Sequence, residues 1–295
     1  MKPDMVMNFR GKPYNMSEEP IVMGILNHTP DSFYSQSRVE SEKMIHERIE
    51  EILREGGKII DVGGYSSRPD AADVSPEDEW QRVNEVLQIL RKNYPDVPVS
   101  VDTFRAEVAR RSIEEGDADI INDVSGGIID PEMLRTVAEL QVPYILMHMR
   151  GTPKSMQKLC HYKGRVADGV IEELLLTIEK LQNLGMKREN IILDPGFGFS
   201  KTTEQNYELM ADLEKFVALD YPLLVGISRK SMIYRFFGTS PQEALNGTAI
   251  LNTFSLLKGA HIIRVHDVLE AVEAVKIVQE LRRLTNNNAE PFLDK

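Results

Sequence analysis

Charged and amide side chains stand at the ends of short apolar runs in this sequence. Asp102, Asn122 and Asp194 fall at the ends of three runs, and Lys230 and Arg264 lie at or near the ends of two later ones. Two carboxylates and an amide suit a flat heterocycle with N–H donors and ring acceptors, and the cations suit a phosphorylated group. Buried acids without partners are too costly to accumulate by chance. We interpret these residues as one binding site, against the alternative of polar strand caps and loop ion pairs.

The apolar runs that carry these residues alternate with amphipathic stretches. Trp80, Val83, Leu87 and Leu90 recur at helical spacing, and Ser75 before a proline is typical of a helix start. Runs that are apolar almost throughout indicate strands buried on both faces, as in parallel sheets. The runs are 21–27, 58–64, 97–103, 119–125, 143–149, 191–196, 222–228 and 261–267.

Eight such units within residues 21–285 predict an α/β fold of the (β/α)8 TIM barrel type. Residues 1–20, with the stretch NFRGKPYNM, are expected to form a tail and a short β-hairpin that plugs the barrel bottom. Residues 286–295 are expected to form a C-terminal tail, and no linker divides the chain, which indicates a single domain. The alternative, a doubly wound open sheet, is disfavoured because no GxGxxG turn follows the first run.

In a (β/α)8 barrel the C-terminal ends of the strands meet at one rim, where active sites are found. Asn27 in the first strand would then lie beside Arg264 and His266 of the last, with Arg68 adding positive charge. The loops after strands 7 and 8 often hold phosphate. This side of the rim is predicted to bind a phosphorylated group, and diphosphate oxygens together with Asn27 would suit Mg²⁺. Zinc is not expected, since the sequence has no HExxH or CxxC motif.

Five further residues near the rim have less specific interpretations. Asp61 either belongs to the pocket for the heterocycle or anchors it from behind. Asp123 is expected either to lie in a turn or to support the pocket residues from behind. His148 and Met147 either line the pocket or belong to the core. Arg229 is expected to form a structural ion pair.

The composition is that of an ordinary globular protein, with 42% hydrophobic and 27% charged residues among 295. A net charge of −11 argues against nonspecific binding of nucleic acid. The sequence has no apolar segment that predicts a signal peptide or a membrane span. The single cysteine, Cys160, rules out an intramolecular disulfide and favours a reducing, cytoplasmic location. Nothing near this thiol indicates an activated nucleophile.

Seven motifs occur in order along the chain: GILNHTPDSF, DVGGYSSRPDA, SVDT, INDVSGG, DPGFGF, SRKS and RVHD. In that order and spacing they resemble the dihydropteroate synthase family, over residues 8 to about 284. Single motifs such as SVDT are weak, but the ordered set is highly specific. The resemblance implies a transferase of folate biosynthesis that joins (7,8-dihydropterin-6-yl)methyl diphosphate to 4-aminobenzoate. It also implies a dissociative reaction in which diphosphate leaves first.

The resemblance further implies roles for individual residues. Lys230, Asp102, Arg264 and Asn27 would act in catalysis, and Asn27 would also contact Mg²⁺. Members of the family are usually homodimers formed through their outer helices. The implied residues are Asp102, Asn122, Asp194, Lys230 and Arg264 for pterin; Asn27, Arg68, Arg264 and His266 for diphosphate; Ser67, Arg68, Pro69, Phe199 and Ser231 for 4-aminobenzoate; and Thr29, Pro30, Asp31 and Phe33 for a mobile loop.

Two loops of this chain depart from the pattern of the family. The first loop usually reads NVTPDSFSDGG, but here His28 replaces the valine and Ser35 replaces the second aspartate, a proposed magnesium contact. In the second loop Ser67 stands where the family has threonine, which keeps the hydroxyl and loses a methyl. These departures leave the pterin residues intact. For the ordering of the first loop, its metal contacts and the sensitivity to sulfonamides, the pattern of the family does not carry over directly to this chain.

Two other functions fit the same barrel. A pterin-dependent methyltransferase would share Asp102, Asn122 and Asp194, but it has no need of the SRKS, RVH and TPDS motifs present here. A non-catalytic paralogue would bind pterin without condensing it, and only the loop departures favour that function. Formation of a product that depends on 4-aminobenzoate separates these alternatives from the synthase.

Overall fold

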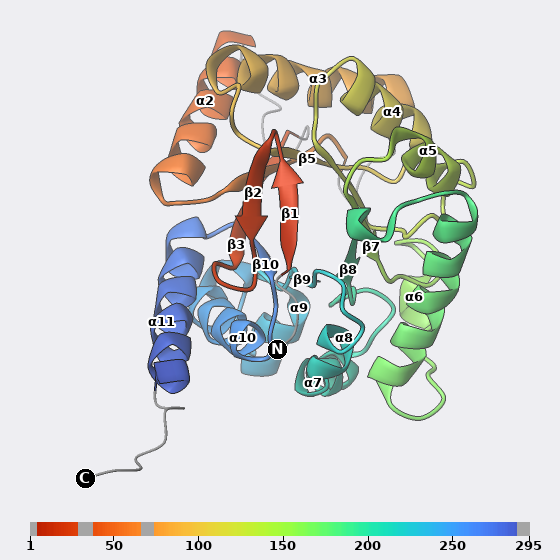
Figure 1. The fold of residues 1–295 in the computed structure, drawn as a ribbon, viewed down its shortest axis with the longest axis vertical. Helices are drawn as coiled ribbons and strands as arrows, with labels where there is room; N and C mark the ends of the chain where they lie inside the picture. The colour runs from red at the N-terminus through yellow and green to blue at the C-terminus, as the bar shows by residue number, and fades with distance from the viewer. Residues whose placement is uncertain (1–4, 29–37, 66–73, 288–295) are drawn as a thin grey trace.

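The computed structural model describes residues 5–28, 38–65 and 74–287. Within these ranges eight parallel strands form a barrel, in the order β8-β7-β6-β5-β4-β3-β10-β9 (Figure 1). A parallel bridge between Leu193 and Leu223 joins the two ends, so the barrel closes and the predicted (β/α)8 fold is confirmed. The barrel strands are β3 (Ile21–Asn27), β4 (Ile59–Gly63), β5 (Val99–Asp102), β6 (Ile120–Asp123), β7 (Tyr144–Met147), β8 (Ile191–Asp194), β9 (Leu224–Val225) and β10 (Ile262–Val265).

Helices surround the barrel, and every barrel strand is followed by at least one of them (Figure 1). Two units depart from the expected single helix, because β8 is followed by α7 and α8 and β9 by α9 and α10. No helix in the described ranges is long and apolar enough to cross a membrane. The helices are α2 (Arg38–Arg54), α3 (Pro76–Asn93), α4 (Ala106–Glu114), α5 (Met133–Leu140), α6 (Val166–Asn183), α7 (Thr203–Ala211), α8 (Glu214–Val217), α9 (Ser231–Phe237), α10 (Leu245–Leu257) and α11 (Val268–Asn287), with short 3-10 helices η1 (Met156–Lys158), η2 (Arg188–Asn190) and η3 (Pro241–Glu243).

The start of α3 shows how local sequence sets an element. Ser75 caps the helix, because its hydroxyl oxygen accepts the Asp78 N–H at 3.1 Å, and a proline occupies the first helical position. The predicted apolar stripe from Trp80 to Leu90 is buried against the barrel. Both predictions for this helix are therefore confirmed.

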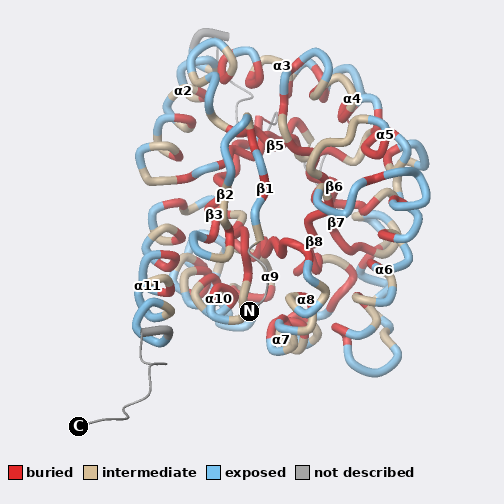
Figure 2. Tube along the Cα trace, in the orientation of Figure 1, coloured by how far each residue is buried: buried red, intermediate tan, exposed pale blue. Residues whose placement is uncertain are grey.

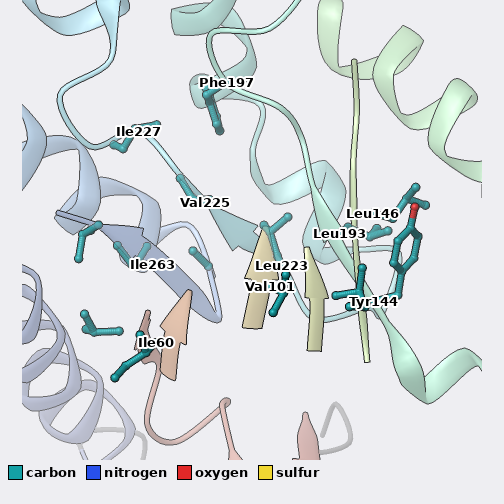
Figure 3. Close-up of a cluster of buried hydrophobic side chains, with 14 of the residues drawn as sticks. Ile60, Val101, Tyr144, Leu146, Leu193, Phe197, Leu223, Val225, Ile227 and Ile263 are labelled. Atoms are coloured by element: carbon teal, nitrogen blue, oxygen red, sulfur yellow. The ribbon is translucent and has the colours of Figure 1, made fainter. Parts of the chain in front are cut away.

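Apolar side chains cover both faces of the barrel sheet. One layer lies between the strands and the helices and includes Ile60, Val101, Leu146, Leu193 and Ile263 (Figure 3). In Figure 2 the barrel strands are mostly buried, whereas exposed residues lie on the outer surfaces of the helices and on β1 and β2. Burial on both faces explains why the strands read as almost continuous apolar runs in the sequence.

The second apolar layer fills the bottom of the barrel. The antiparallel hairpin of β1 and β2, at residues 6–15, lies across the barrel in Figure 1. Its side chains Met7 and Phe9 pack with Ile21 and Ile120, which stand at the starts of β3 and β6. The predicted hairpin plug is therefore confirmed. Because it occupies the N-terminal ends of the strands, the C-terminal ends are left to form the mouth of the barrel.

Candidate active site

Four polar side chains from β4, β5, β6 and β10 meet at the mouth of the barrel. Arg264 donates from Nε to Asp61 Oδ2 and from Nη2 to Asp102 Oδ2, each at 2.6 Å. Asn122 Nδ2 donates to the same Asp61 oxygen at 3.1 Å. Asp61 is fully buried, whereas the side chains of Asp102 and Arg264 are each 19% exposed. Arg264 is thus held by one buried carboxylate and by a second one that still reaches solvent.

The neighbouring carboxylates keep the Arg264 guanidinium charged. Burial alone would lower the pKa of Arg264, but Asp61 and Asp102 raise it above its ordinary value, so the guanidinium stays charged. Burial also raises the pKa of Asp102, and the Arg264 cation opposes that rise. Because Asp61 bonds to both Arg264 and Asn122, the geometry favours the anchoring interpretation of Asp61.

A second pair of opposite charges comes from β8 and from the segment after β9, the strand beside β10. Asp194 ends β8, and one of its carboxylate oxygens accepts the Gly196 N–H at 2.8 Å. Lys230 precedes α9 and donates to the Phe197 carbonyl oxygen at 2.6 Å, with its ammonium 4.8 Å from the centre of the Phe199 ring. Burial lowers the pKa of Lys230 to about 8, although Asp194 opposes the shift. Burial raises the pKa of Asp194, and Lys230 opposes it.

Asn27 and His266 stand on the side of the mouth predicted for diphosphate. Asn27 is exposed at the end of β3, and its side-chain oxygen lies 2.8 Å from where a Cβ on Gly63 would be. Only glycine leaves that space to the amide. The imidazole Nδ1 of His266 lies 3.1 Å from Ser228 Oγ. Desolvation in the mouth, together with the neighbouring Arg264 cation, lowers the pKa of His266 to about 4, so the ring is neutral at pH 7.

The described residues bring together most of the predicted pterin and diphosphate groups. For 4-aminobenzoate, Phe199 lies beside Lys230, and Ser231 begins α9 and is half-buried. The loop predictions for Ser67, Arg68, Pro69, Thr29, Pro30, Asp31, Phe33 and Ser35 fall outside the described residues.

The structure separates neighbouring polar residues from the site. Arg229 forms a paired interaction with Asp267, from Nε at 2.9 Å and from Nη2 at 2.8 Å, so its predicted structural role is confirmed. Asp123 accepts from its own turn and from Tyr144 OH at 2.8 Å, as expected of a turn residue. Met147 packs in an apolar cluster with Val124 and other methionines, which favours the core interpretation.

Two residues that sequence reasoning did not single out lie close to the site. Ser228 hydrogen-bonds to His266 through both the backbone N–H and the ring. Lys201 is a buried lysine that contacts His148 and the backbone after β8. Its position two residues after the DPGFGF motif was the available signal in the sequence. A lysine that is buried there needs several hydrogen-bond acceptors.

The fold and the mouth define a class of protein. A (β/α)8 barrel whose C-terminal rim gathers carboxylates, an amide, an arginine and a lysine has the arrangement of a barrel enzyme that binds a small molecule. A family model described as "Pterin binding enzyme" matches residues 23–266.

Curated and solved relatives extend this match to nearly the whole chain. Dihydropteroate synthase of Escherichia coli K12 is 43% identical over 262 residues, covering 88% of this chain and 91% of the relative. The Synechocystis enzyme of the same name is 40% identical, covering 92% and 93%. The Yersinia pestis dihydropteroate synthase, solved with a sulfonamide drug complex, is 38% identical with a TM-score of 0.85, covering 94% and 99%. The chain belongs to the dihydropteroate synthase family, a family of transferases in folate biosynthesis.

Proposed function

We propose that the chain condenses (7,8-dihydropterin-6-yl)methyl diphosphate with 4-aminobenzoate, releasing diphosphate and 7,8-dihydropteroate. The pterin ring would be bound by Asp102, Asn122 and Asp194, whose oxygens accept from its N–H groups. Lys230 would donate to the acceptors of the ring, and Arg264 would lie against its face. The arrangement that carries the proposal is the convergence of these groups at one mouth.

In the first step the bond between the pterin methylene carbon and the diphosphate oxygen breaks, and the oxygen keeps the electron pair. Arg264 and Arg68 would neutralise the departing charge, while Asn27 and His266 would donate hydrogen bonds to it. Nearby Asp102 would stabilise the cationic carbon that remains. Because the leaving group departs first, no covalent nucleophile of the protein is required.

In the second step the amine of 4-aminobenzoate adds its lone pair to the methylene carbon and then loses a proton. Ser67, Arg68, Pro69, Phe199 and Ser231 would border this substrate. The segment with Thr29, Pro30, Asp31 and Phe33 would close over the reacting carbon and exclude water.

The reaction is tested by incubating the purified chain with both substrates and following diphosphate and dihydropteroate. We expect the two products to appear in equal amounts and only when 4-aminobenzoate is present. A folded protein that binds pterin diphosphate but forms no such product would be a non-catalytic paralogue. We place the reaction in the cytoplasm and expect a sulfonamide to compete with 4-aminobenzoate in this assay.

Mg²⁺ is proposed as the cofactor. In the described part of the chain no group of three or more His, Cys, Asp or Glu side chains is arranged to hold a metal. Asn27 is an exposed residue, and its amide oxygen is a hard donor of the kind Mg²⁺ accepts. This ion commonly takes one or two protein ligands plus phosphate oxygens and water. The residues present therefore fit a metal that is held jointly by Asn27 and the diphosphate. When bound, Mg²⁺ would neutralise diphosphate charge.

Removal of the metal gives a direct test of this proposal. Treatment with a chelator is expected to lower the rate several-fold, and added Mg²⁺ to restore it. In Asn27→Ala the Mg²⁺ concentration for half-maximal rate is expected to rise about tenfold or more, because a single ligand is lost. If the chelator left the rate of the wild-type protein unchanged, the proposal of Mg²⁺ as cofactor would be contradicted.

We propose that the chain forms a homodimer through α10 and α11, which pack against each other. Both helices carry exposed apolar side chains at helical spacing, and such patches on soluble proteins mark interaction surfaces. A second copy of the chain would cover them. The exposed residues are Ile250, Phe254 and Leu257 on α10 and Leu269, Ile277, Leu281 and Leu284 on α11.

The oligomeric state can be tested with two matched leucines. Leu257 on α10 and Leu176 on α6 are both 54% exposed. Leu257→Lys is expected to weaken dimerisation at least tenfold in sedimentation equilibrium, because a lysine would be buried in the interface. Leu176→Lys is expected to leave it unchanged. Wild-type protein that sediments as a monomer at micromolar concentration would exclude this interface.

A further inference from the structure

The loop after β8 contacts the site on one side and a buried lysine on the other. Toward the site, the Phe197 carbonyl oxygen accepts from Lys230 Nζ at 2.6 Å, and the Phe199 ring lies 4.8 Å from the same ammonium. Away from it, Lys201 Nζ donates to the carbonyl oxygens of Gly196 at 2.9 Å and Phe199 at 3.0 Å. Lys201 therefore holds one carbonyl group before and one after the Phe197 carbonyl that accepts from Lys230.

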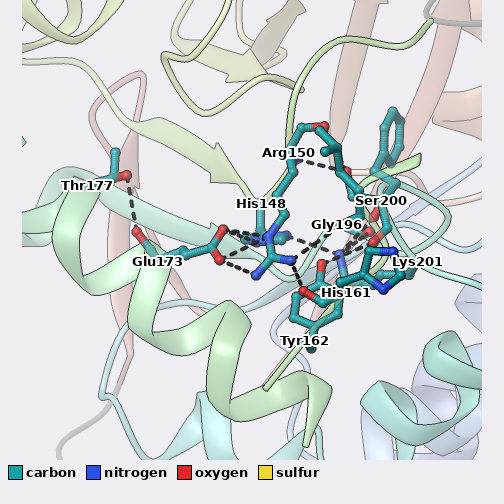
Figure 4. A network of polar contacts seen from close by, with 11 residues as sticks. His148, Arg150, His161, Tyr162, Glu173, Thr177, Gly196, Ser200 and Lys201 are labelled. Atoms are coloured by element: carbon teal, nitrogen blue, oxygen red, sulfur yellow. Dashed lines mark hydrogen bonds and ion pairs between the residues drawn. The ribbon is translucent and has the colours of Figure 1, made fainter. Parts of the chain in front are cut away.

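The third contact of Lys201 determines which ring nitrogen of His148 carries the proton. Its ammonium lies 3.1 Å from His148 Nδ1, and the other ring nitrogen, Nε2, lies 3.0 Å from Glu173 (Figure 4). A lysine ammonium can only donate, so Nδ1 accepts and the imidazole proton is on Nε2, facing the carboxylate. Burial lowers the pKa of Lys201 to about 7, although Asp194 opposes the shift. Below that pH all three ammonium protons of Lys201 have acceptors, although the residue is only 3% exposed.

Charge supports this assignment. Burial and the Lys201 cation lower the pKa of His148 to about 4, so the ring is neutral. Burial opposes ionisation of Glu173, but hydrogen bonds from His148 and Arg150 lower its pKa to about 2. Arg150 Nε donates to both oxygens of that carboxylate, at 2.9 and 3.1 Å. A chain of contacts thus runs from the half-buried Arg150 through Glu173 and His148 to Lys201 (Figure 4).

The backbone of the loop is fixed at the same points. Gly196 has a φ of 71°, and a Cβ there would overlap the His148 carbonyl oxygen, so the loop passes against the end of β7. Asn206 Oδ1 accepts the Gly198 N–H at 2.7 Å. These contacts at Gly196 and Gly198, together with those of Lys201, hold the backbone on both sides of Phe197.

We propose that Lys201, held by His148 and Glu173, is a positioning residue that aims the Lys230 ammonium into the site through the Phe197 carbonyl and the Phe199 ring. This role rests on the proposed function, since Lys230 is assigned there to the pterin. Lys201 itself would not contact substrate. Its removal should leave the barrel folded and reduce activity because Lys230 loses its fixed direction.

The alternative is that Lys201 only stabilises the barrel. A double-mutant cycle distinguishes the two roles, because residues that act through one another lose activity non-additively. Lys201→Met, which keeps the alkyl chain and removes all three donors, is measured in the wild-type and in the Lys230→Ala backgrounds. The readouts are kcat/KM for pterin diphosphate and the Kd of the same ligand by calorimetry.

We expect Lys201→Met to lower kcat/KM about tenfold to a hundredfold in the wild-type background and less than twofold further in Lys230→Ala. Lys201→Gln, which keeps two donors, should recover part of the loss and serves if the methionine variant fails to fold. Lys215→Met, at an ion pair with Asp168 on the surface, is the control and should match wild type. Equal losses in both backgrounds would overturn the positioning role. Inactive wild-type protein would instead overturn the proposed function.

Discussion

Lys230→Ala is expected to lower kcat/KM for pterin diphosphate by a factor on the order of 10² to 10³. The ammonium is one of two cations described at the mouth, and it is fixed between the Phe197 carbonyl and the Phe199 ring. A preorganised charge in a partly buried site contributes more than one in water, and loss of such a donor typically costs a factor of this size. Steady-state kinetics with both substrates measures the loss.

The pH dependence gives a second signature of the same residue. Burial lowers the pKa of Lys230 to about 8, so the ammonium is present below that pH and is lost as pH rises through it. Because kcat/KM reports groups of the free enzyme, the wild-type value is expected to fall on the alkaline side near pH 8. In Lys230→Ala this alkaline limb should disappear, while any limb that belongs to the substrate should remain.

The fold of the variant is expected to survive. A lysine whose pKa is lowered by burial costs folding free energy at pH 7, so its removal is not expected to unfold the barrel. Circular dichroism and thermal unfolding check this point, and Lys215→Ala on the surface serves as the control. Wild-type kinetics in folded Lys230→Ala would show that the mouth has been misassigned.

The barrel could be predicted from the sequence because its strands are buried on both faces. Runs such as residues 21–27 and 191–196 contain few polar residues, and their polar members fall where strands end. The pairing of Asp102 with Asn122 across β5 and β6 follows from the register of parallel strands. The strands, their order and the polar residues at their ends could therefore be predicted from parallel topology and the apolar pattern.

Contacts that depend on the exact path of a loop could not be predicted. Nothing in the sequence places the Lys201 ammonium against His148, which lies on another strand end, or the Arg264 guanidinium against Asp61. The short extra helices α8, after β8, and α9, after β9, were also missed, because they have only four and seven residues, too few for a clear periodicity. Long-range polar geometry emerges only once the barrel has closed.

Asp194→Asn is expected to separate ligand binding from stability. Asp194 is 5% exposed, and its carboxylate accepts one backbone N–H, from Gly196 at 2.8 Å. An asparagine can keep that bond, but it replaces the second acceptor oxygen with a donor. The second Asp194 oxygen is the one proposed to accept from the pterin ring. Its loss should raise the Kd for pterin diphosphate about tenfold to a hundredfold, the usual range for a lost hydrogen bond to a charged group. Calorimetry with the pterin substrate alone measures it.

Asp194→Asn should weaken ligand binding but should keep or raise the stability of the fold. Burial raises the pKa of Asp194 in the folded chain, so the ionised carboxylate costs folding free energy above that pKa, and the cost fades as pH falls. Asp194→Asn removes this cost, and its Tm at pH 7 should equal or exceed that of wild type, with a smaller difference in acid. Asp123→Asn provides the contrast, because both carboxylate oxygens of Asp123 accept hydrogen bonds within the protein, and it should lose stability.

The Kd and the Tm of Asp194→Asn together show whether the carboxylate serves ligand binding or packing. A residue retained for ligand binding weakens the fold and strengthens the complex, whereas a residue retained for packing does the reverse. An unchanged Kd would remove Asp194 from the pterin site. A Tm at pH 7 well below wild type would show that its bond to the Gly196 peptide stabilises the loop after β8 by more than the buried charge costs.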